Sequence, residues 1–188
     1  MPFNARKAAQ VIAYFIAKNG GNAIHVVKAI KLVYLADRQS ITDFGFPVID
    51  DVYVSMPHGP VNSNTYRHVN AEYDLDACGW SDFLQGKANH EIGATKKFER
   101  DDLDELSEAD IQALDKVWEK FGPMDTWALR NWTHNRKNIP EWENPNGSSA
   151  LIPLERILGF LQIENVDEQV SLIEDHKYID NVFDNLRR

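Results

Sequence analysis

The sequence predicts a mainly α-helical fold: a compact multi-helix domain with a small two-stranded antiparallel β ribbon. Apolar residues recur at helical spacing over 5–18, 107–121 and 166–186. Only 48–55 and 92–100 have the composition typical of strands. With 43% hydrophobic residues, five Trp and nine Phe among 188 residues, the chain has enough apolar material for a full core.

Two helices are expected in the N-terminal quarter of the chain. The first runs from near Ala5 to Lys18 and ends at 19–22, where two glycines favour a left-handed cap. The second runs roughly from Ile24 to Thr42. It is apolar around most of its circumference, which is typical of a central helix packed on several sides. The sequence FGFP at 44–47 is expected to end it.

The middle of the chain is predicted to contain the ribbon and a third helix. Strand 48–55 is followed by Pro60, which is expected to open a helix that reaches about Glu72, because proline is favoured at the first helical position. Residues 80–84 are expected to form a weak helix or a turn. The second strand, 92–100, is expected to pair with the first, and the acidic residues 101–105 are expected to form a solvated loop.

The C-terminal third is predicted to be helical apart from one loop. A helix over 107–121 begins with a capping box formed by Ser107 and Asp110. Another helix covers 124–134, a loop follows at 139–149, and Pro153 starts a short helix. The last helix runs from 166 to about 186, and its apolar positions are Val170, Ile173, Val182, Phe183 and Leu186. This apolar stripe is expected to pack either on its own domain or on another chain.

The charge and the cysteine content restrict the partners. The net charge of −9 disfavours a nucleic-acid partner, although local basic patches around Arg130, Arg136 and Lys137 stay open. The same charge fits either ordinary solubility or a basic partner. The single Cys78 excludes an intramolecular disulfide and an all-thiolate metal site. Because we find neither a signal-peptide pattern nor a run of about 18 apolar residues, we expect a cytoplasmic protein with no membrane partner.

Charged residues interrupt the apolar helix at 24–42. Lys31 and Arg38 are seven residues apart and share a face, and Asp37 lies beside Arg38. Buried charges are costly unless they are paired, so Asp37 is expected to meet a cation. Two interpretations follow: a structural ion pair at the edge of the core, or a polar pocket that receives a residue of a partner.

Two further motifs carry histidine. In Pro57-His58-Gly59-Pro60 the prolines stiffen a strand-to-helix turn, so His58 is either a solvent-facing residue of a shaped turn or a contact residue of a binding surface. Thr133-His134 ends a helix, and Pro140-Glu141-Trp142 is expected to fold back on it. This unit either pins its own loop or contributes to a binding surface.

Three segments carry a resemblance: the helix segment at 31–38, the turn at 56–61, and Thr133-His134 followed by Pro140-Glu141-Trp142. In this order they resemble the Panacea-domain antitoxins, the SocA-like family, whose members are also described as phage-associated proteins. The resemblance spans Ala8 to Trp142. It implies a Panacea-like antitoxin domain, which we place at 1–150. The tail at 151–188 shows least resemblance, and we expect it to be a C-terminal helical extension packed on the same domain. The positions on which the family motif falls are Lys31, Tyr34, Asp37, Pro57, His58, Gly59, Pro60, Tyr66, His134 and Trp142.

The resemblance implies an antitoxin that binds a toxin encoded by a neighbouring gene and neutralises it by direct contact, without a cofactor. One alternative is an adaptor that delivers the toxin to an ATP-dependent protease of the ClpXP type. Another is a hydrolase or metal enzyme that uses His58 and His134 together with Asp37. The sequence contains no H-E-x-x-H, C-x-x-C, G-x-S-x-G or Gly-rich phosphate loop, so we predict no enzyme and no metal. A phage structural or regulatory role finds no support from a heptad pattern or a repeat.

Overall fold

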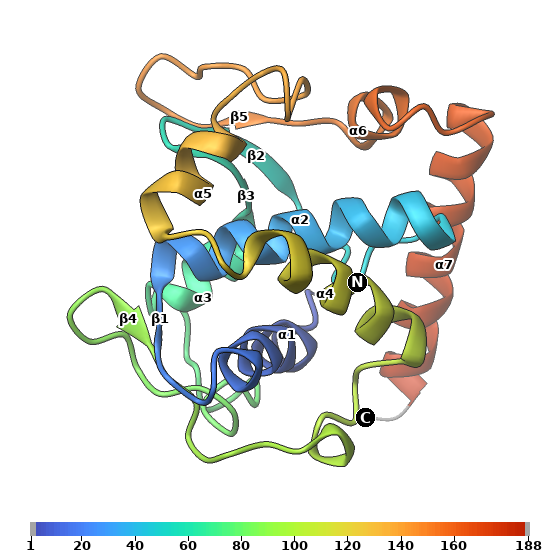
Figure 1. Ribbon diagram of the computed structural model, residues 1–188. Helices are drawn as coiled ribbons and strands as arrows, with labels where there is room; N and C mark the ends of the chain where they lie inside the picture. The colour runs from blue at the N-terminus through green and yellow to red at the C-terminus, as the bar shows by residue number, and fades with distance from the viewer. Residues whose placement is uncertain (1–2, 187–188) are drawn as a thin grey trace.

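The computed structural model describes residues 3–186 and is mainly helical, which confirms the predicted fold class. Figure 1 shows α2 (Val26–Phe44) crossing the middle of the molecule. On one side of it lie α1 (Ala5–Lys18) and α4 (Glu108–Phe121), and on the other lies α5 (Thr126–Thr133) together with a small sheet. No helix within residues 3–186 is both long and apolar enough to cross a bilayer.

The central helix is α2, as its all-round apolar character predicts. It packs against α1, α4, α5 and the short helix α3 (Ser63–Val69). Leu32, Val33 and Tyr34 are three successive residues of α2 that are completely buried, which is possible only when neighbours cover the helix on several sides. The helix starts two residues later than predicted and ends two residues later, at Gly45 in the left-handed conformation (φ 82°).

Helices with strong end signals lie where the sequence places them. The first helix has the predicted bounds, and α4 begins with the predicted capping box between Ser107 and Asp110. The helix α5 is shorter than predicted at both ends because Asp125 caps it and His134 ends it. The short helix α6 (Leu154–Phe160) follows Pro153, and α7 (Val166–Leu186) has its predicted bounds.

The predicted pairing of 48–55 with 92–100 is wrong. The two-stranded ribbon consists of β1 (Ile24–His25) and β4 (Glu91–Ile92), which are antiparallel. The first predicted strand corresponds to β2 (Tyr53–Met56), which lies between β3 (Gly59–Asn62) and β5 (Ala150–Leu151) in a three-stranded antiparallel sheet. Strands this short carry little local signal, so their partners are decided by the packing of the helices around them.

Two other predictions between 60 and 105 are corrected. Pro60 lies in β3, an edge strand that tolerates a residue without an N–H group, and α3 begins only at Ser63 and ends at Val69. The acidic stretch 101–105 is not a plain loop, because its first residues belong to the short 3-10 helix η1 (Arg100–Asp102). Residues 80–84 form a turn, one of the two predicted alternatives.

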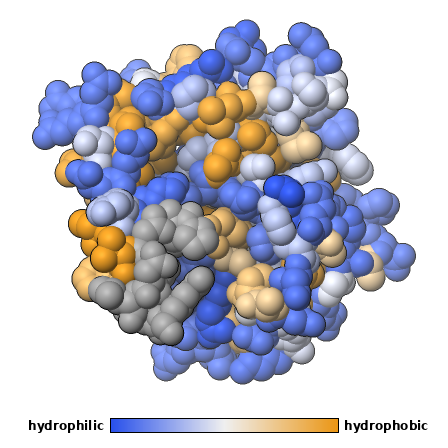
Figure 2. Space-filling view, turned by 180° about the vertical axis from the view of Figure 1, so that it is seen from behind, coloured by the Kyte–Doolittle hydropathy of each residue, from blue (hydrophilic) through white to orange (hydrophobic). Residues whose placement is uncertain are grey.

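The last helix packs on the rest of the chain through some of its described side chains and leaves others exposed. Ile173 is buried, and Gln169 Nε2 donates to the carbonyl oxygen of Gly45 at 2.7 Å. Val182 and Phe183, predicted for the buried stripe, are 42% and 56% exposed. The Leu186 side chain lies outside the described residues, and Val170 is partly buried against the core. Figure 2 shows the side opposite to Figure 1, where hydrophobic residues reach the surface. The division at residue 150 stays a prediction.

Candidate functional site

The hairpin between β2 and β3 presents the Pro57-His58 pair at its tip. Met56 pairs with Gly59, so the turn has proline at its second position and glycine at its fourth, the preferences of a type I turn. Gly59 has φ +95°, and a Cβ atom there would lie 3.1 Å from Lys31 Nζ and 3.3 Å from Thr133 Oγ1. The glycine is therefore required both by the backbone and by the close approach of α2 and α5.

Side chains of α5 and the following loop hold this turn. Arg130 Nη2 donates to His58 Nδ1 at 2.9 Å, and His134 Nε2 donates to the carbonyl oxygen of Pro57 at 3.0 Å. Trp142 Nε1 donates to the carbonyl oxygen of Met56 at 3.0 Å, and its ring lies 4.1 Å from that of His134. The segments 133–134 and 140–142 therefore meet, as predicted, and the hairpin is what they meet on.

Lys31 reaches the base of the turn from α2. Its side chain is 1% exposed, and Nζ donates to the carbonyl oxygen of Pro60 at 2.7 Å. Among residues 3–186 it has no ion-pair partner. Burial and, after it, the nearby charge of Arg130 together lower the pKa of Lys31 to about 7. In its protonated form the lysine places a positive charge at the base of the turn that no carboxylate of the described residues pairs with.

The loop before Trp142 is tied to α2 through a buried carboxylate. Glu141 is fully buried and accepts a hydrogen bond from the Tyr34 hydroxyl at 2.7 Å. Arg38 Nε lies 2.6 Å from Glu141 Oε1 without hydrogen-bond alignment, and Arg38 Nη2 donates to Glu141 Oε2 at 3.4 Å. Burial, followed by the charge of Glu141, raises the pKa of Tyr34 well above its usual value, so the phenol stays protonated.

The prediction that Asp37 meets a cation is wrong within the described part of the chain. Its carboxylate accepts hydrogen bonds from three neutral donors: Ile49 N at 2.9 Å, Asn62 Nδ2 at 2.8 Å and the Tyr53 hydroxyl at 3.0 Å. The nearby cations are engaged elsewhere, Arg38 by Glu141 and Lys31 by Pro60. Burial raises the pKa of Asp37 to about 7, although these hydrogen bonds oppose the shift.

Asp51 is a structural residue that the sequence analysis missed. Its carboxylate accepts hydrogen bonds from the backbone N–H groups of Asn64 and Thr65, the second and third residues of α3. It therefore caps this helix from twelve residues before its start, a distance at which no local capping pattern exists. In the sequence, Asp51 is an aspartate within the predicted strand 48–55 and two residues before β2, a position that carries no capping signal.

The ten predicted motif residues occupy three regions. Lys31, Pro57, His58, Gly59, Pro60, His134 and Trp142 surround the hairpin turn. Tyr34 and Asp37 lie farther along α2. The Tyr34 hydroxyl donates to Glu141, and the Asp37 carboxylate accepts from Asn62 of β3. Tyr66 lies on α3, partly buried against the core, without a side-chain hydrogen bond or ring contact to the other nine. Most of these side chains are buried and form a frame for the hairpin.

The histidines are held by hydrogen bonds rather than gathered around a common point. His58 uses Nδ1 as an acceptor from Arg130, which has only donors to offer, and His134 uses Nε2 as a donor to a carbonyl group. Within residues 3–186, no three His, Cys, Asp or Glu side chains are placed so that they could hold a metal ion together.

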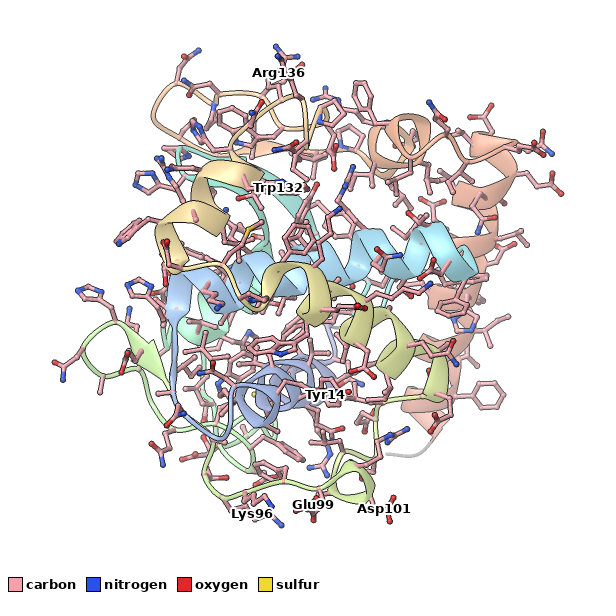
Figure 3. The ribbon with its side chains drawn as sticks, viewed as in Figure 1. Tyr14, Lys96, Glu99, Asp101, Trp132 and Arg136 are labelled. Atoms are coloured by element: carbon pink, nitrogen blue, oxygen red, sulfur yellow. The ribbon has the colours of Figure 1, made fainter. Side chains whose placement is uncertain are left out.

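The side chains of Trp132 and Arg136 point in opposite directions, one into the molecule and one out of it. Figure 3 shows Trp132 directed inward from α5, where its ring contacts Phe121 of α4 at 4.7 Å, and Arg136 directed outward from the following loop.

The family model for "Antitoxin SocA-like, Panacea domain" matches residues 30–143, a range that contains all ten motif residues. Neither the curated proteins nor the solved structures contain a match to this chain.

Proposed function

The chain belongs to the family of antitoxin SocA-like proteins with a Panacea domain, and we propose that it is the neutralising half of a bacterial or phage toxin–antitoxin pair. In this proposal it binds a toxin encoded by a neighbouring gene and blocks it by direct contact. The observation that carries the proposal is the family match over 30–143. It is supported by the convergence of three distant motif segments on a single hairpin.

The proposed role requires contact and no chemistry. The two histidines of the motif each hold a neighbouring group, His58 through Arg130 and His134 through the carbonyl oxygen of Pro57. Lys31 is too deeply buried to reach a substrate. We therefore propose a protein without a catalytic step or cofactor that acts in the cytoplasm, where its partner is made.

Co-expression with the product of the neighbouring gene tests the proposal. The expected result is that the neighbouring gene alone arrests growth, that this chain restores it, and that the two proteins purify together as a stable complex. Restored growth with loss of the toxin, reversed by deleting the protease gene, would replace blocking by delivery to a ClpXP-type protease. A neighbouring product that is not toxic, or that this chain neither binds nor counteracts, would contradict the antitoxin role.

A further inference from the structure

One face of α5 points away from the core and carries residue types that dominate protein interfaces. Trp127, Arg130, Asn131 and His134 are spaced by three, four and seven residues, so they share one side of the helix. The other side of α5 is fully buried through Leu129 and Thr133. Tryptophan and arginine are enriched among the residues that supply most binding energy in interfaces.

Trp127 is unusual for an outer position of a short helix. Its side chain is 62% exposed, and its only ring contact within the described residues is an edge-on one with His25 at 5.7 Å between ring centres. A large aromatic ring that stays exposed to water contributes little of the stabilising free energy that its burial would provide. The core of the molecule therefore does not account for Trp127.

The hairpin tip continues this face, because hydrogen bonds connect it to α5 and to His134. Arg130 of α5 donates a hydrogen bond to the ring of His58, and His134 donates one to the carbonyl oxygen of Pro57. The loop after α5 adds Arg136, which points outward in Figure 3. We use the name α5–hairpin face for His58, Trp127, Arg130, Asn131, His134 and Arg136.

The face is basic on a chain that is acidic overall. The net charge of the chain is −9, and 29 of its 188 residues are Asp or Glu. None of these 29 lies within 52–71 or 126–140, the two segments that build the face. The buried Lys31 lies beneath it, and the charges of Arg130 and Lys31 contribute to a lowered pKa of His134, after the larger effect of burial.

The acidic residues at the margins of the face have partners of their own. Asp125 accepts hydrogen bonds from the first N–H groups of α5, and Glu143 forms an ion pair with Arg156 at 3.3 Å. They therefore border the face without neutralising its centre. A ligand that pairs with this face must supply negative charge.

We propose that the α5–hairpin face docks an acidic segment of the partner protein, with a carboxylate at Arg130 and Arg136 and an apolar group over Trp127. The proposal rests on the antitoxin function, because it names the surface through which the toxin is held. A nucleic acid fits less well, since proteins that bind it typically neutralise about 6–10 phosphates, whereas Arg130, Arg136 and Lys137 supply the cations of 126–140.

The test measures binding of the purified product of the neighbouring gene to the full chain and to four variants. Trp127→Ala and Arg136→Glu change the face. Tyr178→Ala removes an aromatic ring that is 70% exposed on α7, and Lys97→Glu reverses a cation whose side chain is 85% exposed. Lys97 lies between Lys96 and Glu99, which Figure 3 places at the opposite end of the molecule, so these two variants are matched controls.

Trp127→Ala is expected to weaken binding by about 30-fold, as for an interface residue that supplies much of the binding energy. Arg136→Glu is expected to weaken it by about 10-fold, mainly through slower association that is sensitive to salt. The two controls should stay within about twofold of wild type, and all four variants should unfold at the wild-type temperature, because the altered side chains are exposed.

Three results overturn the proposal. In the first, the wild-type chain binds the neighbouring protein and both face variants bind it equally well, so the docking surface is wrong while the antitoxin function stands. In the second, the face variants lose binding to a 20-base-pair DNA duplex and keep binding to the protein, so the face is a nucleic-acid site. In the third, the wild-type chain itself does not bind and does not restore growth, so the antitoxin function fails and the docking proposal fails with it.

Discussion

Replacing Asp37 by Asn is expected to remove a pH dependence of stability that the wild-type protein shows between about pH 4 and pH 7. The side chain is fully buried, and burial raises its pKa from 3.8 to about 7. In this range the folded protein keeps a proton on Asp37 that the unfolded chain has already lost. The free energy of unfolding of the wild-type protein therefore falls as the pH rises.

The size of the effect follows from the two pKa values. A shift from 3.8 to about 7 corresponds to about 4 kcal/mol over the whole range, of which about 2 kcal/mol is lost between pH 5 and pH 7. The variant should still fold, because an asparagine oxygen can accept from Ile49 N. Its amide group would face Asn62, whose Oδ1 is buried without a hydrogen-bond partner and can accept once that side chain turns over.

Urea unfolding at pH 5, 6 and 7, followed by tryptophan fluorescence, measures this difference. The free energy of unfolding of the wild type minus that of Asp37→Asn should fall by about 2 kcal/mol between pH 5 and pH 7. Asp101→Asn, at an exposed position far from the hairpin in Figure 3, is the matched control and should give a constant difference. A difference for Asp37→Asn that is flat or rises with pH would refute the assignment of a raised pKa to this carboxyl group.

Three further substitutions test the frame around the hairpin. Lys31 has a pKa lowered to about 7, so the folded state gives up its proton first, and the stability of the wild type relative to Lys31→Met should rise by about 2 kcal/mol between pH 7 and pH 9 in the same urea assay. Tyr34→Phe leaves a buried oxygen of Glu141 with one donor fewer and should cost about 1–3 kcal/mol of unfolding free energy at pH 7. Gly59→Ala should lower the thermal midpoint more than Gly147→Ala, because both have positive φ but only Gly59 has atoms within 4 Å of the added methyl group; equal losses would show that backbone strain alone matters.

The helices were predictable where their signals are local. Ala5–Lys18 is bounded by residues that act within one turn, and Ser107 forms its capping box with Asp110 only three residues away. Asparagine, glycine and serine at such positions have the same effect whatever surrounds them. Neither helix therefore depends on tertiary packing for its ends.

The strands were not predictable because their partners lie far away in the sequence. Ile24 pairs with Ile92, and Val54 pairs with Leu151, across separations that no local pattern encodes. Pro60 illustrates the ambiguity: its fixed φ and missing N–H group suit both the first turn of a helix and an edge strand. The sheet decides between them, because β2 is available as a partner.

The candidate site divides in the same way. The residue types at 31, 37, 58, 134 and 142 could be singled out from the sequence, but their partners could not. The ion pair of Arg38 with Glu141 joins residues that are 103 positions apart, and it is this pair that leaves Asp37 with neutral donors only. A charge pattern along one helix gives no information about such a competitor.

The buried frame and the α5–hairpin face should respond to substitution in separate ways. Lys31, Asp37 and Glu141 are enclosed, so a change at any of them alters the folded state before it alters a contact with another protein. Trp127 and Arg136 are exposed, so a change there leaves the core packing intact. Since Lys31 Nζ donates to the carbonyl oxygen of Pro60 at the base of the hairpin, the frame fixes the position of the face without fixing its outer side chains. Under the docking proposal, exchange of a few side chains on α5 and the following loop is expected to change which toxin the same fold accepts.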